Sequence, residues 1–149
     1  MYRMRYSEGV AVKRKTASAV QVPALGVKEK QSKRIPAIFF RTEAGGEPLR
    51  EWLKGMLSPE DRKRIGEDIK TVEFGWPIGM PVCRPLSGGI FEVRTHLDRN
   101  RIAGVLFYVG TKGRMVLLHG FIKKAQKTPP DDLELARKNK RKHERGLAQ

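Results

Sequence analysis

The chain has 149 residues, enough for one domain with a modest core, and its 31 Lys and Arg against 16 Asp and Glu give a formal net charge of +15. No apolar run approaches the ~18 residues of a membrane span. The single cysteine, Cys83, excludes an internal disulfide and is typical of the reducing cytoplasm, and the scattered histidines predict neither a metal site nor a bound cofactor. So large a positive charge indicates a polyanionic partner: nucleic acid first, an acidic protein second, an anionic membrane third.

The excess charge lies at the two ends of the chain. Residues 1–34 carry 9 Lys and Arg against 2 Asp and Glu, and residues 122–149 carry 9 against 4. Residues 35–121 are nearly balanced, with 13 against 10. We expect a basic flexible arm over residues 1–33 and a folded domain over residues 34–149. A solvated tail without a partner explains the N-terminal excess equally well.

The first predicted elements are a strand and two helices. The apolar run 35–40 predicts a strand, and Pro36 suits either the start of a strand or an edge, where no ladder donor is required. Pro48 opens a helix with one apolar stripe, and Ser58 is the N-cap of a second helix. The two stripes recur at helical spacing: Leu49, Trp52, Leu53 and Met56, then Ile65, Ile69 and Val72. Two helices joined so tightly predict a hairpin that lies on a sheet, with Trp52 in the core.

The second half of the chain predicts three strands and a helix. Residues 75–85 are expected to form a loop, and the strands are expected over residues 90–95, 101–109 and 114–121, joined by short turns as an antiparallel meander. A final helix is expected from about 131 to 144. Its apolar stripe is thin, which predicts that the helix packs only weakly on the rest of the domain. The predicted fold is α+β: a small twisted antiparallel sheet of about four strands, with an N-terminal helical hairpin on one face and a C-terminal helix.

A cationic face is predicted on this sheet. Alternation places Glu92 and Arg94 on the face away from the hairpin, and the ends of the neighbouring strands add Arg101, His119, Lys123 and Lys124. The sequence shows no Ser-His-Asp set, no paired carboxylates and no phosphate-binding glycine loop. The remaining chemistry is to bind an RNA phosphate and to stabilise the phosphorane formed by attack of a 2′-hydroxyl. A lysine among other cations has a lowered pKa and suits a general base.

Each of these residues also has a purely structural interpretation. Arg94 would form an exposed cross-strand pair of little energetic value, and the lysines would be solvated charges before a helix. His119 would be a half-buried histidine that makes a hydrogen bond. The convergence of these residues at one end of a sheet favours a functional site.

Several segments carry a family resemblance: the helix 49–56, Cys83-Arg84-Pro85-Leu86 with the glycine pair after it, Phe91-Glu92-Val93-Arg94, and above all Leu117–Phe121 with Lys123-Lys124 and Gln126–Pro129, followed by Ala136. Through them the chain from Ile35 to about Arg141 resembles the RelE/ParE superfamily of toxins from type II toxin–antitoxin modules, in particular the phage-derived HigB-like branch. The resemblance leaves out the first 33 residues.

The resemblance implies a ribosome-dependent endoribonuclease that is metal-independent, cleaves mRNA and arrests translation in the cytoplasm. It also implies a helix-turn-helix antitoxin as partner. Arg94 and Arg101 resemble the strand cations that hold the scissile phosphate, and Lys123 and Lys124 the basic residues that stabilise the transition state. Further candidates for RNA binding are Arg84, Arg114 and Lys127. The tyrosine that some relatives carry after the lysines is missing, so Thr128, His119 or another group would transfer the proton. Two alternatives remain: a gyrase-inhibiting toxin of the same fold, and a non-catalytic basic module that binds RNA or an acidic partner.

Overall fold

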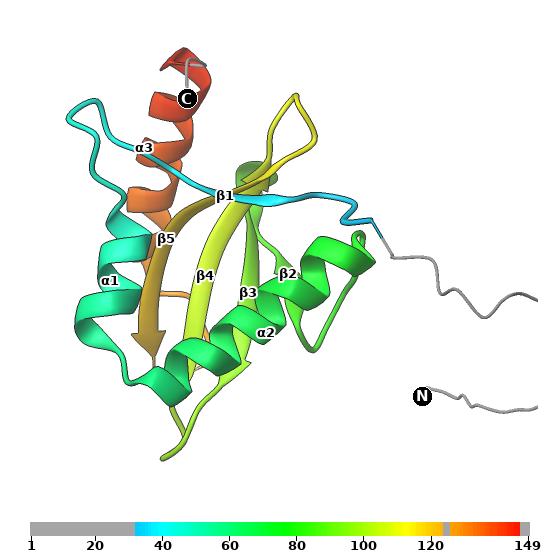
Figure 1. Cartoon of the computed structure of the whole chain (residues 1–149), viewed down its shortest axis with the longest axis vertical. Coiled ribbons are helices and arrows are strands. Elements are labelled where there is room, and N and C mark those ends of the chain that lie inside the picture. The colour runs from blue at the N-terminus through cyan, green and yellow to red at the C-terminus, as the bar shows by residue number, and fades with distance from the viewer. Residues whose placement is uncertain (1–31, 124–125, 147–149) are drawn as a thin grey trace, which may run out of the picture. The chain divides into compact units, whose positions relative to one another are not determined.

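The computed structural model describes residues 32–123 and 126–146, and every helix and strand below belongs to the unit Lys33–Gln149 (Figure 1). Five strands form one mixed sheet in the order β1-β5-β4-β3-β2. The strands are β1 Ala37–Phe39, β2 Cys83–Pro85, β3 Phe91–His96, β4 Ile102–Val109 and β5 Met115–Lys123. The predicted arm over residues 1–33 lies, up to residue 31, outside the described residues.

The predicted α+β class is confirmed, and two details of the sheet are corrected. The sheet has five strands rather than about four, because β2 falls in the predicted loop and its three residues are too few to show alternation. The sheet is mixed rather than antiparallel, because β1 pairs with β5 in parallel while the other neighbours are antiparallel. The predicted meander corresponds to β3, β4 and β5, and β1 lies at an edge of the sheet, one of the two positions that Pro36 suits.

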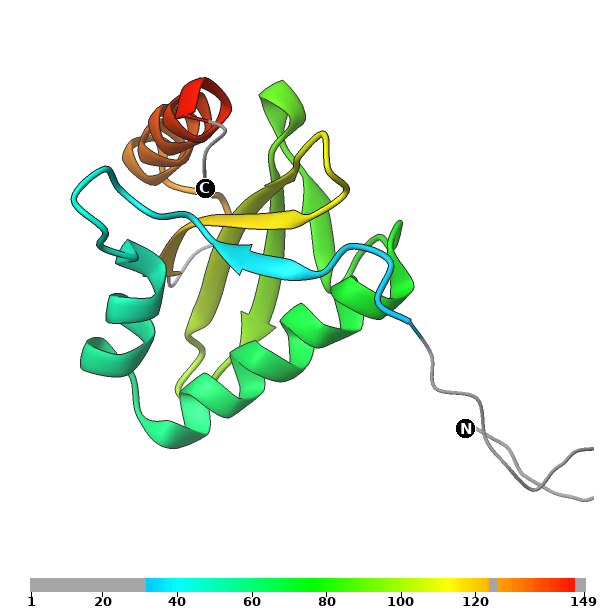
Figure 2. The same ribbon diagram turned by 45° about the horizontal axis from the view of Figure 1, so that its top comes forward.

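Two helices cover one face of the sheet, as predicted. They are α1 Pro48–Met56 and α2 Pro59–Gly75. Ser58 caps α2, since its hydroxyl accepts a hydrogen bond from the amide of Asp61 at 3.1 Å. Arg62 then donates to the carbonyl of Leu57 at 2.7 Å, which satisfies one of the free carbonyls at the end of α1. Figure 2 shows the two helices splayed apart, and α1 contacts β5 whereas α2 contacts β3.

The core between these helices and the sheet is apolar. Its fully or nearly fully buried members include Leu49, Ile65, Val72, Val93, Val105 and Phe107. Trp52 packs on this cluster, as predicted, and its ring lies directly over Gly120 of β5. A Cβ atom at Gly120 would lie 2.6 Å from Trp52 Cζ3, so only glycine allows α1 to approach the sheet so closely.

The third helix, α3 Pro130–Gly146, lies on the opposite face (Figure 2). Ala136 is its fully buried residue and packs in a second cluster with Leu106, Leu118 and Phe121. Polar bonds supplement the thin apolar stripe, because Asn139 Nδ2 donates to the carbonyl of Leu118 at 2.9 Å. Within the described residues, no helix has the length and apolarity that crossing a bilayer requires.

A β-bulge in β5 sets which side chains face α3. Leu106 pairs with His119 and Phe107 pairs with Leu117, so Leu118 is the extra residue. Leu118 and Phe121 both pack in the cluster under α3, whereas Leu117 packs in the cluster under α1 and α2. The bulge therefore places His119, Phe121 and Lys123 on the α3 side of the sheet although Leu118 also faces that side.

Candidate functional site

A fully buried carboxylate lies at the centre of the candidate site. Glu92 on β3 has 0% relative exposure, and a buried carboxylate is costly unless cations pair with it. Lys123 Nζ on β5 donates to Glu92 Oε2 at 2.9 Å. Arg84 Nη2 and Arg94 Nε lie 3.4 Å and 3.6 Å from Glu92 Oε1. Three cations therefore surround one carboxylate, and positive charge is in excess.

The same three cations also hold the oxygens of Gln126. Its main-chain carbonyl accepts hydrogen bonds from Lys123 Nζ at 2.9 Å and from Arg84 Nη2 at 3.1 Å. Its side-chain Oε1 accepts a hydrogen bond from Arg94 Nη2. Gln126 itself is exposed to solvent. Two oxygens of one exposed residue thus occupy the point where three cations converge.

Thr128 completes this cluster, because its hydroxyl donates to Glu92 Oε2 at 3.2 Å and accepts from Arg84 Nη2 at 3.0 Å. Arg94 and Lys123 are each only 5% exposed, so they do not form the open cationic surface that the sequence predicts. Both side chains are paired with the buried Glu92, and residues 126–128 cover the cluster on its solvent side. Arg84 is partly exposed and connects the cluster to solvent.

A glycine on β4 makes room for the carboxylate. Gly104 pairs with Arg94 on one side and with Phe121 on the other. A Cβ atom at Gly104 would lie 2.6 Å from Phe121 Cζ and 2.7 Å from Glu92 Oε2. The Phe121 ring also lies 5.7 Å from Lys123 Nζ, measured to its centroid. Gly104 therefore lets an aromatic ring and a carboxylate cover the same part of β4.

The environment lowers the pKa of Lys123. Burial is the largest cause, and the charges of Arg84 and Arg94 act in the same direction. The hydrogen bond and the charge of Glu92 oppose it by favouring the ammonium form. On the other face of the sheet, burial raises the pKa of the Cys83 thiol to about 11, and the charge of Glu92 adds to this shift. Cys83 is therefore an inert core residue rather than a nucleophile.

The predicted site residue His119 lies beside the cluster and is already bonded. Its Nε2 is 2.6 Å from Asp132 Oδ1 in the first turn of α3, and its ring stacks on Phe121 at a centroid distance of 5.9 Å. Its role in proton transfer stays a prediction. The phenyl ring of Phe121 contacts both His119 and the ammonium of Lys123, so all three form a row along β5.

Arg101 does not join the predicted set. Its guanidinium binds both oxygens of Asp61 on α2, at 3.1 Å and 3.3 Å, and its Nε donates to the carbonyl of Asp98. This pair is on the helix-hairpin side of the sheet, so Arg101 fixes α2 to the turn between β3 and β4. Pairing with a carboxylate 40 positions earlier in the chain leaves no local signal in the sequence.

The remaining candidates are dispersed. Arg114 lies at the start of β5 and Lys123 at its end, roughly 30 Å apart at ~3.3 Å per residue. Lys127 is exposed next to Gln126, within reach of the cluster. Lys124 lies outside the described residues. The structure therefore brings together Arg84, Arg94 and Lys123, and places Arg101 and Arg114 elsewhere.

Sequence reasoning placed Glu92 on the predicted cationic face but gave it no role, and it left Gln126 and His96 out of the candidate site. A carboxylate in the middle of a strand, flanked by Phe91 and Val93, is a signal for burial and pairing that could have identified Glu92. His96 follows Arg94 by two residues on the same face of β3 and is exposed. It pairs with Ile102, whose other partner is Lys123, so the main chains of His96 and Lys123 are about 10 Å apart at ~4.8 Å per strand.

Within the described residues, no group of three or more His, Cys, Asp or Glu has an arrangement that would hold a metal ion. The family model described as "Phage derived protein Gp49-like (DUF891)" matches residues 51–141. The chain therefore belongs to the Gp49-like family of phage-derived proteins, which is part of the RelE/HigB-type group of toxins from toxin–antitoxin systems. No curated protein matches the chain.

Proposed function

We propose that this protein is the toxin of a type II toxin–antitoxin system and that it cleaves mRNA on the ribosome. The observation that carries the proposal is the convergence of Arg84, Arg94 and Lys123 on the two oxygens of Gln126. Cations that meet on a pair of oxygens offer the geometry that a phosphodiester requires. Membership in a toxin family supports this proposal.

In this proposal the scissile phosphate takes the place of Gln126. The carboxylate of Glu92 stays below and holds the three cations in position, so that little reorganisation is needed when the phosphate enters. Arg84 reaches the phosphate first, because it is the partly exposed member of the set. Lys127, exposed beside the cluster, binds a neighbouring phosphate of the same RNA.

The reaction is an in-line displacement at phosphorus. The 2′-oxygen of the RNA attacks the phosphorus, the bond to the 5′-oxygen breaks, and the products are a 2′,3′-cyclic phosphate and a 5′-hydroxyl. One proton leaves the 2′-hydroxyl and one is added to the 5′-oxygen. Arg94 and Lys123 stabilise the charge of the phosphorane. His96, an exposed imidazole, takes the proton from the 2′-hydroxyl and then donates it to the 5′-oxygen as that bond breaks.

Cleavage of mRNA in a translation extract, mapped by primer extension, tests the site. We expect Arg84→Ala and Arg94→Ala to lower the cleavage rate by ~10²-fold or more, as loss of one transition-state donor does. Lys70→Ala is the matched control, because it removes an exposed cation from α2 on the other side of the sheet. Equal cleavage by the wild type and both arginine variants would refute the site.

The substitution Gln126→Ala distinguishes two interpretations of the cluster, a phosphate-binding site and a purely structural group of ion pairs. In the proposed site the side-chain amide competes with RNA for Arg94, so its removal should raise the affinity for RNA. If the cluster only stabilises the fold, the same variant should lower the melting temperature without an effect on RNA. Thermal unfolding by circular dichroism and RNA binding by fluorescence anisotropy are therefore measured on the same sample.

The proposal includes an antitoxin partner with a helix-turn-helix domain, which relieves growth arrest when both chains are co-expressed. The same expression experiment distinguishes the other functions. DNA breaks with intact mRNA would identify a gyrase-inhibiting toxin. Salt-sensitive RNA binding without cleavage would identify a non-catalytic RNA-binding module.

A further inference from the structure

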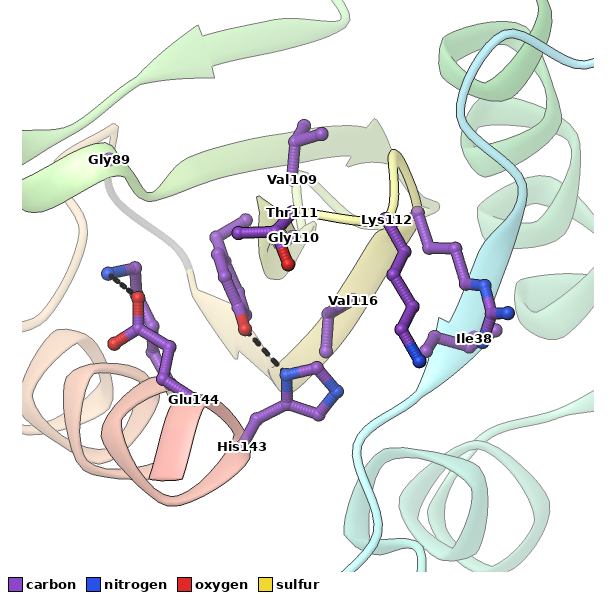
Figure 3. A pocket seen from close by; sticks show the side chains of 12 residues that line it. Ile38, Gly89, Val109, Gly110, Thr111, Lys112, Val116, His143 and Glu144 are labelled. Carbon is purple, nitrogen blue, oxygen red and sulfur yellow. Dashed lines mark hydrogen bonds and ion pairs between the residues drawn. The ribbon is translucent and has the colours of Figure 1, made fainter. Parts of the chain in front are cut away.

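A second site lies at the opposite end of the sheet from Lys123. A cavity of about 270 Å³ opens between the end of β4, the start of β5 and the last turns of α3 (Figure 3). Its walls are mainly apolar and include Ile38 of β1, Val116 of β5 and the ring of Tyr108. Glu144 also lines the cavity, where its carboxylate is paired with Lys140. Neither the buried Glu92 nor any of its three cations lines it. The cavity is therefore separate from the proposed phosphate site.

Cations stand at the rim of this cavity. Lys112 in the turn between β4 and β5 and Arg114 at the start of β5 are both exposed. Neither makes an ion pair with an acidic side chain of the part of the chain that the structure describes. Lys140 of α3 differs, because its ammonium binds Glu144 at 3.0 Å and lies 5.1 Å from the centroid of the Tyr108 ring. The positive charges of Lys112 and Arg114, which have no acidic partner in the described residues, thus lie next to an apolar cavity.

A buried imidazole in the cavity wall has one nitrogen without a partner. His143 of α3 is 7% exposed, and its Nδ1 is 2.5 Å from the hydroxyl of Tyr108. Its Nε2 is buried and has no hydrogen-bond partner among the described residues. Figure 3 shows the His143 ring with one nitrogen on a dashed hydrogen bond, which is the bond to Tyr108, and with its second nitrogen turned toward the side of the cavity where Lys112 lies. An unsatisfied buried nitrogen costs ~1–3 kcal/mol, so a ligand that bonds to it gains affinity.

The protonation state of His143 determines which kind of ligand atom can bond to its Nε2. Burial raises the pKa of the Tyr108 hydroxyl, which keeps it protonated and able to donate to His143 Nδ1. The imidazole then carries its proton on Nε2, which makes this nitrogen a donor. A donor beside an ammonium and a guanidinium group requires an anionic acceptor. The apolar walls require that this acceptor be attached to a hydrophobic group.

We propose that this cavity is a docking site for an acidic segment of the antitoxin, which inserts one large apolar side chain between Ile38, Tyr108 and Val116 and places an adjacent carboxylate on Lys112, Arg114 and His143 Nε2. The partner rests on the proposed toxin function. A cavity of about 270 Å³ fits a Leu or Phe side chain and is small for a stacked nucleotide with its ribose and phosphate. Charge complementarity and apolar walls together favour an acidic peptide over RNA.

The site offers a filling variant that does not strain the chain. A Cβ atom at Gly110 would lie 3.7 Å from Val116 Cγ2 and 3.9 Å from the Tyr108 hydroxyl oxygen, which are ordinary van der Waals distances. A side chain at this position therefore enters the cavity. Gly110→Leu fills the apolar part, whereas Lys112→Glu reverses a charge at the rim. Lys70→Glu makes the same charge change on α2 and is the matched control.

Isothermal titration calorimetry of the full-length chain against the purified antitoxin tests the proposal. We expect Gly110→Leu and Lys112→Glu each to weaken binding by at least tenfold, Lys70→Glu to change it less than twofold, and melting temperatures to stay within a few degrees. Unchanged antitoxin affinity in both cavity variants, or no antitoxin binding by the wild type, would overturn the proposal. So would displacement of the antitoxin by an RNA oligonucleotide that loses affinity in the same variants.

Cleavage assays on the same proteins keep this inference separate from the proposed function. Neither cavity variant should change the rate of mRNA cleavage, because both are at the far end of the sheet from Arg94. If the wild type binds antitoxin through the cavity but cleaves no RNA, the proposed activity fails and the docking site stands. If cleavage depends on Arg94 but the cavity variants bind antitoxin normally, the reverse holds.

Discussion

At the scale of single residues, the buried Glu92 organises the candidate site. A carboxylate without solvent exposure is retained only when its partners compensate for its missing hydration, and here Lys123, Arg84 and Arg94 do so. Removing one partner of such a pair leaves a buried charge without compensation, which costs ~3–5 kcal/mol. The cations are therefore fixed in place before any substrate arrives, as a site for phosphoryl chemistry requires.

Gly104 makes this arrangement sterically possible, and Gly104→Ala tests it. The added methyl would lie 2.7 Å from Glu92 Oε2 and 2.6 Å from Phe121 Cζ, so the carboxylate and the ring must both move. We expect the free energy of unfolding to fall by ~1–3 kcal/mol, the usual cost of overpacking, and mRNA cleavage to fall more than stability explains. Urea denaturation and primer extension measure the two effects.

Gly66→Ala provides the control for Gly104→Ala. Gly66 lies in α2, and nothing is within 4 Å of a Cβ atom built there. The same substitution should therefore raise the free energy of unfolding by up to ~1 kcal/mol through helix propensity and leave cleavage unchanged. Equal behaviour of the two variants would show that Glu92 and Phe121 can relax around a methyl group at Gly104.

At the scale of elements, local signals predicted local structure. Ser58 marked the start of α2, and the alternation from Phe91 to Arg94 placed Glu92 and Arg94 on the correct face of β3. These signals are confirmed because capping and strand alternation depend on neighbours within a few residues. The alternation along β3 thus predicted which face carries Arg94, although not what Arg94 binds.

Features that depend on distant residues were not predictable in the same way. The bulge at Leu118 exists because β5 must fit β4 while it places both Leu118 and His119 toward α3. The pairing of Arg101 with Asp61 and of Arg94 with Gln126 joins residues 40 and 32 positions apart. Only the folded chain decides which carboxylate or amide meets each guanidinium. The sequence therefore predicted which types of residue form the site better than it predicted which individual residues come together.

The docking of α3 should depend on pH through His143. Burial lowers the pKa of its imidazole below 6.5, with Lys112 acting in the same direction and Glu144 opposing. Because the folded pKa is lowered, the stability from the neutral imidazole is fully present above pH 6.5 and is lost as pH falls through the folded value. We expect the wild type to lose more stability than His143→Gln between pH 7.5 and pH 5, measured by urea denaturation.

If the imidazole were protonated equally in the folded and unfolded chains, the stability of the wild type and of His143→Gln would change with pH in parallel. That result would contradict this prediction. Tyr108→Phe serves as a comparison, since it removes the hydroxyl bonded to Nδ1 and leaves the imidazole in place. It should lower stability at every pH and keep the wild-type dependence on pH. Titratable groups other than those at positions 108 and 143 are common to all three proteins and cancel in the comparison.

At the scale of the whole molecule, much of the excess positive charge lies outside the part of the chain that forms the proposed site. The proposed phosphate site uses residues 84 to 128, whereas residues 1–31 carry 7 Lys and Arg against 2 Asp and Glu. Excess charge beyond the site raises affinity for RNA of any sequence and makes that affinity depend on salt. It does not alter the chemistry at the phosphate. The site and the N-terminal charges should therefore contribute to different measurable quantities.

A chain that begins at residue 32 tests this separation. We expect its melting temperature and its cleavage rate at saturating RNA to match those of the full chain, because every helix and strand described lies in Lys33–Gln149. Its affinity for RNA should fall, and the plot of log affinity against log salt should become shallower by ~0.7 for each phosphate of a single strand that residues 1–31 neutralise in the full chain. Fluorescence anisotropy between roughly 50 and 300 mM KCl, a range over which the Debye length falls by a factor of about 2.5, gives this slope. Identical slopes for the two chains would show that the first 31 residues leave RNA untouched and that the cations of the folded unit supply all of the attraction.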